Sequence, residues 1–408
     1  MSVSANDRTI LRDLAKRVAE IASLPMMAER RAMWTRHNGL ERVRPMVLIF
    51  PEGSWGELLP QDVLACGGEQ ARRIEWRLRS RIYYHEHLHD DTVIETEWVV
   101  GKVVRNTGWG LSAEHIPATE ARGAWKFRPV INEPADLKKL HFPEVTYDEE
   151  ATQRNLAEAQ ELFGDILDVR LKGISHISFH LMNLYTGLRG LEEVMMDMVA
   201  NPGWLHDAMA FLEEGHRRLI QQYIDQNLLS LNNDATYNST GGNGYTAELP
   251  REDFDGTVRP CDMWASAEAQ ELALVSPDMH REFSLDYEKR LLAPFGLTGY
   301  GCCEDLTHKL DDVLTIPNIR RISISPFADV DACAGKLGDS AIFSWKPHPS
   351  HLVGEFNPDF IRDYIRHTLE VTRGCIVEMI LKDTHTCEHH PERFTLWTQI
   401  ARELAEQY

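Results

Sequence analysis

Two adjacent thiols are the first candidate for chemistry in this sequence. The segment GYGCCEDL, residues 299–306, places Cys302 and Cys303 directly before two carboxylates. Because adjacent residues of an extended strand point to opposite sides, we expect Cys302 to face a functional site and Cys303 to be packed. His385 and Cys387 follow a later apolar segment, and thiolate and imidazole are ligands that zinc favours. These residues could hold one metal ion together, or could lie near loops without one.

A cluster of histidines is the second candidate. The segment YYHEHLHDD, residues 83–91, has three histidines at alternate positions and two aspartates after them. A metal held by His85, His87 and the distant Asp383 would lower the pKa of a bound water and make it a nucleophile, as in metal-dependent hydrolases. The alternative is a solvated, polar junction between two elements.

The segment PEGSW, residues 51–55, pairs a carboxylate with an aromatic ring. Glu52 and the face of Trp55 would suit a flat organic substrate. A turn with a packed tryptophan explains the same residues equally well.

Composition limits the class of protein. The chain has 408 residues, 63 of them acidic and 43 basic, for a formal charge of −20. This charge repels phosphate backbones and anionic membranes, so we expect neither nucleic acid nor a membrane as partner. The amphipathic N-terminus has no apolar core of the signal-peptide kind, so a cytoplasmic location is expected. The seven cysteines are irregularly spaced, which predicts reduced thiols.

The chemistry-bearing residues must be positioned by a regular framework. Short apolar segments alternate with long helical patterns, which is typical of parallel strands joined by crossover helices. Eight such strands predict an α/β fold, a (β/α)8 TIM barrel. The predicted strands are 46–50, 81–85, 171–179, 228–234, 295–301, 320–325, 341–345 and 375–382.

The same pattern predicts the organisation of the chain. Residues 1–45 form an N-terminal helical extension, and 46–408 form one catalytic barrel domain. Residues 92–125 alternate apolar and polar side chains and predict a β-hairpin inserted after the second strand. Residues 235–266, rich in Gly and Asn, predict a second insertion. Helices are expected at 61–80, 150–164, 188–226 with a break at NPGW, 268–292, 304–314, 328–338, 358–373 and after Pro391.

In such a barrel the chemistry lies at the carboxyl ends of the strands. The segments there read PEGSW, HEHLHDD, HLMN, ATYNSTGGNGY, GCCED, PFADVD, KPHPSH and KDTHTCEHH. Nearly all hold ionisable or soft ligands, which favours an active site at this end.

Three collinear segments resemble the uroporphyrinogen decarboxylase superfamily. They begin at FHLMNLYTGLRGLEEVMM, at LVSPDMHREFSLDYEKRLL and at ISISPFADVDACAGKLG, and their order and spacing match over residues 40–405. The superfamily includes porphyrinogen decarboxylases and methyltransferases that serve corrinoid proteins. Decarboxylases bind their substrate through arginines after the first strand, where this sequence reads FPEGSW. Without guanidinium groups to pair with substrate carboxylates, decarboxylation is disfavoured.

The resemblance therefore implies a corrinoid-dependent methyltransferase. It would move a methyl group from a small donor, a methoxylated aromatic or a methylamine, to the cobalamin of a separate corrinoid protein. Such barrels commonly pair, so a homodimer is expected. A metal-dependent hydrolase and a non-catalytic or decarboxylase-like binding barrel are the alternatives.

The resemblance also implies roles for particular residues. Relatives carry a His-x-Cys zinc motif where this chain has Tyr300-Gly301-Cys302, so zinc would be held by Cys302, His385 and Cys387. The superfamily's active-site aspartate matches Asp90 or Asp91, which would orient or protonate the substrate. The substrate pocket would be lined by Glu52, Trp55, Tyr237 and His348.

Overall fold

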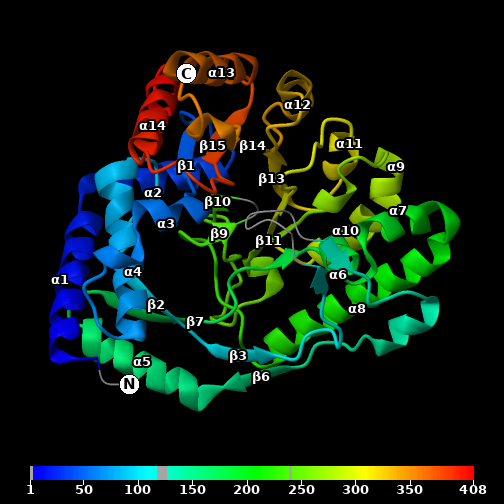
Figure 1. The fold of residues 1–408 in the computed structure, drawn as a ribbon, viewed down its shortest axis with the longest axis horizontal. Helices are drawn as coiled ribbons and strands as arrows, with labels where there is room; N and C mark the ends of the chain where they lie inside the picture. The colour runs from blue at the N-terminus through cyan, green and yellow to red at the C-terminus, as the bar shows by residue number, and fades with distance from the viewer. Residues whose placement is uncertain (1–2, 117–125, 239–240) are drawn as a thin grey trace.

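The computed structural model describes residues 3–116, 126–238 and 241–408. Its centre is a parallel sheet of seven strands in the order β1–β15–β14–β13–β12–β11–β8, surrounded by helices (Figure 1). The strands are β1 (Met46–Ile49), β8 (Ser178–Phe179), β11 (Trp264–Ala267), β12 (Leu297–Tyr300), β13 (Ile319–Ile324), β14 (Ile342–Trp345) and β15 (Ile376–Leu381).

The strands of this sheet are covered on both faces. Every residue of β1, β11, β12, β14 and β15 is buried. Strands buried on both faces are rich in apolar residues, which explains why all of these segments except β11 could be predicted as short apolar strands. The protein is thus an α/β protein, as predicted.

The sheet curls strongly. Lys382, directly after β15, lies 3.7 Å from the sulfur of Cys302, which follows β12, although β13 and β14 lie between these strands. Three strand spacings in a flat sheet would separate them by roughly 14 Å. Over the described ranges, however, no strand pairs with the outer edges of β1 and β8. The curled sheet has seven strands, and strand pairing does not close it into the predicted eight-stranded barrel.

Two of the predicted strands are wrong. Residues 81–85 belong to α4 (Glu69–Tyr83) and to the π-helical turn η3 (Tyr84–Leu88). The buried residues Ala71, Leu78 and Ile82 recur at helical spacing, and this periodicity outweighs the strand propensity of the Ile-Tyr-Tyr run. Residues 228–234 form a single bridge, from Leu229 to Ile174.

Two other regions differ from the prediction in their boundaries. The expected strand 171–179 divides into β7 (Asp168–Lys172) and β8. Strand β11 was not predicted, because it lies at the end of the segment 235–266 that was expected to be an insertion. This segment also contains the short pair β9 (Tyr237–Asn238) and β10 (Gly242–Asn243).

The predicted hairpin at 92–125 pairs differently. β2 (Glu97–Gly101) runs parallel to β7, and β3 (Val103–Asn106) runs antiparallel to β6 (Val145–Asp148). β2 and β3 therefore pair with later segments instead of with each other, so the hairpin prediction is wrong there. β4 (Glu114–Ile116) pairs with β5 (Lys126–Arg128), and residues 117–125 of the prediction lie outside the described residues.

Most predicted helices are present with shifted boundaries, but the one predicted at 304–314 is helical only at its end, and the one predicted at 268–292 begins at Pro277. The break predicted at NPGW falls at Asn201, between two helices, because Pro202 starts a new helix well and cannot continue the old one. The longer helices are α1 (Ala5–Ala22), α2 (Pro25–Asn38), α5 (Glu149–Phe163), α6 (Leu181–Arg189), α7 (Leu191–Ala200), α8 (Pro202–Asp225), α12 (Val330–Leu337), α13 (Pro358–Val371) and α14 (Glu392–Ala405). The shorter ones are α3 (Trp55–Leu58), α9 (Pro277–His280), α10 (Asp286–Leu292) and α11 (Leu310–Val313).

The N-terminal helices share the core of the protein. Buried residues of α1, including Leu11 and Val18, join one apolar cluster with Leu48 of β1 and Ile380 of β15. His37 at the end of α2 reaches the fully buried Glu378 of β15, which also pairs with Arg321 of β13. None of the described helices combines the length and the apolar character needed to cross a bilayer.

Candidate active site

Parallel strands bring their carboxyl ends to one edge of the sheet. We call the group of side chains at this edge the mouth. It comprises Phe50 and Glu52 after β1, His180 after β8, Glu268 after β11, Cys302, Cys303 and Glu304 after β12, Lys346 after β14, and Lys382 and Asp383 after β15.

A thiol pair and a lysine meet in the mouth. The sulfur atoms of Cys302 and Cys303 are 3.5 Å apart, and Lys382 Nζ donates to the Cys302 sulfur at 3.7 Å. Cys303 donates to Asp383 Oδ2 at 3.3 Å, and Asp383 lies 3.4 Å from the Lys382 ammonium. The four side chains therefore form one contiguous group drawn from β12 and β15.

The prediction that Cys303 is packed away from the site is wrong. Both cysteines are partly exposed and their thiols touch. The cause is Gly301, whose φ of 91° ends the extended conformation just before the pair. A Cβ at this position would lie 2.7 Å from Leu306 Cδ1, so a larger residue could not make the same turn.

The thiol and the amine of this group both hold their protons. The hydrogen bond with Cys303, together with burial, raises the pKa of the Cys302 thiol far above its ordinary value. Burial alone would lower the pKa of Lys382, but neighbouring acidic groups, the Asp383 carboxylate among them, outweigh it and the pKa is raised. The mouth thus contains an ammonium beside a carboxylate and two thiols.

A histidine–glutamate pair lies on the neighbouring strands. His180 Nδ1 and Glu268 Oε1 are 2.5 Å apart, and the His180 side chain is 40% exposed while that of Glu268 is 8% exposed. Burial alone would lower the pKa of His180, but the hydrogen bond and charge of Glu268 raise it. His180 Nε2 has no hydrogen-bond partner among the described residues. This arrangement favours an imidazolium with one nitrogen available to a ligand.

A second buried carboxyl lies beside this pair. Glu304 accepts the backbone N–H groups of Cys302 at 2.7 Å and of Ala269 at 3.4 Å. Burial, followed by the charge of Glu268, raises the pKa of Glu304 to about 7. In addition, Glu268 Oε2 is buried without a hydrogen-bond partner in the described part of the chain. An unpaired buried acceptor of this kind can receive a donor from a ligand.

Aromatic side chains border the cation. Tyr237 is 38% exposed, and its ring meets that of Phe50 edge to face at 5.4 Å. Burial raises the pKa of Tyr237 to about 12, and Lys382, Cys302 and Glu52 also act on its hydroxyl. Tyr237 and Glu52, both expected to line a substrate pocket, therefore lie at the mouth, and substrate contact stays a prediction.

The three predicted zinc ligands do not come together. Cys387 is fully buried and donates to Glu57 Oε2 at 3.1 Å, while Cys302 contacts Cys303 and the Lys382 ammonium. A cation 3.7 Å from the Cys302 sulfur disfavours a metal ion at the same atom. Across the residues that the structure describes, no group of three or more His, Cys, Asp or Glu side chains is placed to hold a metal. Cys302, Cys387 and His385 as arranged do not fit zinc, and its presence stays a prediction for elemental analysis.

The two predicted catalytic aspartates anchor a loop to β1. Asp90 accepts the backbone N–H of Ile49, and Asp91 accepts that of Val47, each at 2.9 Å. Asp91 also pairs with Arg44 at 2.6 Å, and both carboxylates are buried. These bonds give both residues a structural role, and their catalytic role stays a prediction.

Trp55 is packed among aromatic rings, whereas His348 lies on the rim of the mouth. Trp55 meets the rings of Trp76, Tyr83 and Tyr84 edge to face at 5.5 to 5.7 Å, as expected for a packed tryptophan. His348 lies on the rim after β14, where its Nδ1 bonds the Ser350 hydroxyl at 2.7 Å. Their substrate contacts stay predictions.

The alternative hydrolase site is not assembled. His85 and His87 lie in the π-helical turn η3, and the His87 ring packs against that of Tyr83 at 4.3 Å. Asp383 instead accepts the hydrogen bond of Cys303. No observation on the described residues favours this alternative.

Sequence reasoning did not select His180, Glu268 or Lys382. His180 and Lys382 open the strand-end segments HLMN and KDTHTCEHH, so their position after a strand was a usable signal. Glu268 was not found because its strand, β11, had been assigned to an insertion.

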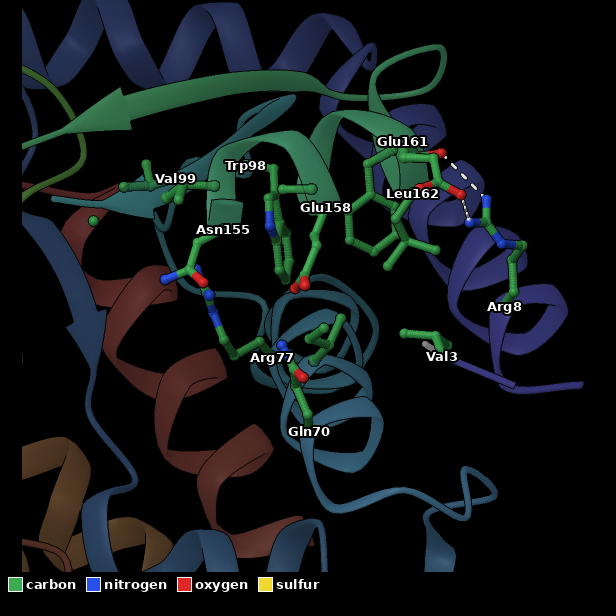
Figure 2. Close-up of a pocket in the computed structure, with 15 residues that line it drawn as sticks. Val3, Arg8, Gln70, Arg77, Trp98, Val99, Asn155, Glu158, Glu161 and Leu162 are labelled. Atoms are coloured by element: carbon green, nitrogen blue, oxygen red, sulfur yellow. Dashed lines mark hydrogen bonds and ion pairs between the residues drawn. The ribbon is translucent and has the colours of Figure 1, made fainter. Parts of the chain in front are cut away.

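A cavity of about 470 Å³ lies away from the mouth, between α1, α4, β2 and α5. Figure 2 shows Arg77 and Trp98 on its walls, and the Arg77 guanidinium lies over the Trp98 ring at 4.2 Å. Arg8 and Glu161 at its edge pair with each other. These groups are engaged with one another, so the mouth is the stronger candidate for chemistry.

Comparisons with known proteins identify no family for this chain. No protein-family model and no curated protein matches it. Among solved structures, a methyltransferase from Methanosarcina mazei is similar, with 14% sequence identity and a TM-score of 0.49. The alignment covers 92% of this chain and 98% of that chain.

Proposed function

We propose that this protein transfers a methyl group from a small methylated donor to the cobalamin of a separate corrinoid protein. The donor is a methoxylated aromatic or a methylamine. The observation that carries the proposal is the meeting of a fixed cation, Lys382, and a proton-bearing pair, His180 and Glu268, in one mouth. The corrinoid acceptor rests on the sequence resemblance.

Methyl transfer requires stabilisation of the oxygen or nitrogen atom from which the methyl group leaves. The cobalt of cob(I)alamin attacks the methyl carbon, and the electron pair of the carbon–oxygen or carbon–nitrogen bond passes to the oxygen or nitrogen. A negative charge developing there is stabilised by a nearby ammonium in a site shielded from water. Lys382, 8% exposed, is such a group.

The departing atom also needs a proton when the donor is an ether. His180 Nε2 is free of partners in the described residues, and Glu268 keeps the ring charged from the opposite side. General acids of this kind contribute about 10²–10⁴-fold to rate. We assign His180 as the proton donor and Glu268 as its positioning residue, with Tyr237 and Phe50 against the apolar part of the donor. Apart from the cobalt of the acceptor, no step in this scheme uses a metal ion.

The experiment uses chemically reduced free cob(I)alamin as acceptor, with a panel of methoxybenzoates and methylated amines as donors. We expect methylcobalamin from at least one donor, and a loss of about 10²–10⁴-fold in kcat for His180→Gln with an ether donor. His367→Gln is the matched control, because His367 is exposed and pairs with Asp331 on the outer helices. Full activity of His180→Gln would refute the assigned acid, and no transfer from any donor would refute the function.

A further inference from the structure

The contact between Cys302 and Cys303 is not used in the methyl-transfer scheme. Their sulfur atoms lie 3.5 Å apart at adjacent positions of the chain, and both residues are partly exposed. Cys66, Cys333, Cys375 and Cys387 are buried, and Cys261 is partly exposed. The protein therefore holds one paired and reachable dithiol among its seven cysteines.

We propose that Cys302 and Cys303 are a reversible oxidation site, which a low-molecular-weight disulfide converts to a disulfide between the two residues, and that this oxidation stops the chemistry of the mouth. The existence of the site is independent of the methyl-transfer function. Only the second part, the effect on turnover, rests on the proposed function.

The geometry favours formation of the bond. Both thiols already face the same space because Gly301 turns the chain before them. The sulfur atoms need to approach by about 1.5 Å to reach the disulfide length of about 2.05 Å. Rotation about the Cα–Cβ bonds moves sulfur atoms over such a distance without large movement of the backbone.

The same geometry makes the bond easy to reverse. Adjacent Cα atoms are about 3.8 Å apart, whereas disulfides usually join Cα atoms about 4.4–6.8 Å apart. A disulfide between neighbours is therefore strained, and strained, exposed disulfides are the readily reduced ones. These are properties of a switch, in contrast to those of a structural cross-link.

The order of attack follows from the contacts. Cys303 donates its hydrogen bond to the Asp383 carboxylate, which can accept the proton as the sulfur attacks. Cys303 attacks the small disulfide and releases one thiol as a mixed disulfide forms. Cys302 then attacks the Cys303 sulfur, gives up its proton and releases the second thiol. Two protein thiols are oxidised, and one small disulfide is reduced to two thiols.

Closure of the bond alters the mouth directly. Lys382 donates to the Cys302 sulfur, and the Cys302 N–H donates to Glu304. Movement of the Cys302 sulfur toward Cys303 therefore displaces its contact with the Lys382 ammonium. Since Lys382 borders the proposed substrate position, we expect oxidation to lower turnover.

The test starts with the intact full-length protein and oxidised glutathione. Mass spectrometry of the wild type is expected to show loss of two hydrogens, located in the peptide that contains both cysteines, and recovery with dithiothreitol. Cys302→Ser should accumulate the mixed disulfide at Cys303, because no resolving thiol remains. The control Cys261→Ser should behave as the wild type. The proposed site would be overturned if the wild type formed no disulfide between Cys302 and Cys303, or if Cys302→Ser also lost two hydrogens through a disulfide elsewhere.

Turnover is measured on the same samples. Oxidised wild type and oxidised Cys261→Ser should lose at least about tenfold in methyl transfer to free cob(I)alamin and regain it on reduction, since a tenfold loss corresponds to about 1.4 kcal/mol of barrier. Unchanged turnover in protein whose disulfide is still present by mass spectrometry at the end of the assay would refute the switch while leaving the methyltransferase in place. If the reduced protein has no turnover with any donor, the proposed function fails, and the mass measurement still decides the oxidation site.

Discussion

The pair Arg321–Glu378 allows a quantitative test of how the inside of the curled sheet is held. Both side chains are 0% exposed, and Arg321 Nε donates to Glu378 Oε1 at 2.9 Å. Ser344 and His37 also bond the same carboxylate. Burial alone would raise the pKa of Glu378, but Arg321 outweighs it and the pKa lies well below its ordinary value. The pair is therefore fully charged in the folded protein.

Glu378→Gln keeps the volume of the side chain and removes its charge. The guanidinium of Arg321 is then buried without a counter-charge, and its Nη1 already lacks a partner in the described residues. Breaking a buried ion pair in this way costs about 3–5 kcal/mol. Arg321→Met should cost a similar amount, because it removes the group that contributes most to stabilising the charged Glu378 carboxylate.

The single variants Arg321→Met and Glu378→Met and the double variant Arg321→Met/Glu378→Met form a cycle. Urea unfolding followed by circular dichroism measures the free energy of unfolding of each. The double variant should be more stable than either single variant, because no uncompensated charge remains and methionine fills the space. Single costs below about 1 kcal/mol, or a double variant whose loss equals the two single losses together, would show that the pair is not coupled as described.

Three further outcomes follow from particular contacts. Burial raises the pKa of Asp90 from 3.8 to about 6, so the folded state binds a proton more tightly than the unfolded state, and the free energy of unfolding falls by about 3 kcal/mol as pH rises between these values, at about 1.36 kcal/mol per pKa unit. Urea unfolding from pH 4 to 7 should show this fall for the wild type and not for Asp90→Asn. An equal fall in both proteins would contradict the raised pKa. Glu268→Gln should lower the pKa of His180, so the fall of kcat at high pH should begin at a lower pH than in the wild type. A lower kcat whose fall begins at the same pH would indicate a purely structural role for Glu268. Gly242→Ala places a Cβ 2.2 Å from Arg321 Cζ and should cost about 1–3 kcal/mol in unfolding experiments; an unchanged melting temperature would count against this close approach.

Long apolar strands and amphipathic helices could be predicted from the sequence because they depend on local periodicity. The segments that became β12, β13, β14 and β15 all carry branched aliphatic or aromatic residues, and α13 begins at Pro358 after an Asn357 cap. The segment around Tyr83 was predicted wrongly because its aromatic residues favour strands locally, whereas burial of one face of α4 decides its structure. The pairing of β2 with β7 could not be predicted, because register between distant segments depends on tertiary packing.

The candidate site was predictable only in part. Cys302 was selected by its residue type and by its place after a strand, and it lies at the mouth. The neighbour Cys303 was expected to face away because the chain was treated as extended, and the conformation of Gly301 changes this. Cys387 follows β15 as Cys302 follows β12, yet the carboxylate of Glu57 draws its loop toward α3. Proximity along the chain to a strand end does not determine where a loop turns.

The position of the N-terminal helices has a consequence for biosynthesis. His37 and Asn38, at the end of α2, bond Glu378 and Arg321, and β1 pairs with β15, the last strand. The earliest part of the chain to leave the ribosome must therefore wait for partners made some 280 to 340 positions later. Until β15 emerges, the inner edge of β1 and the polar end of α2 are uncovered, so synthesis passes through a long interval in which chaperones or neighbouring chains can bind them.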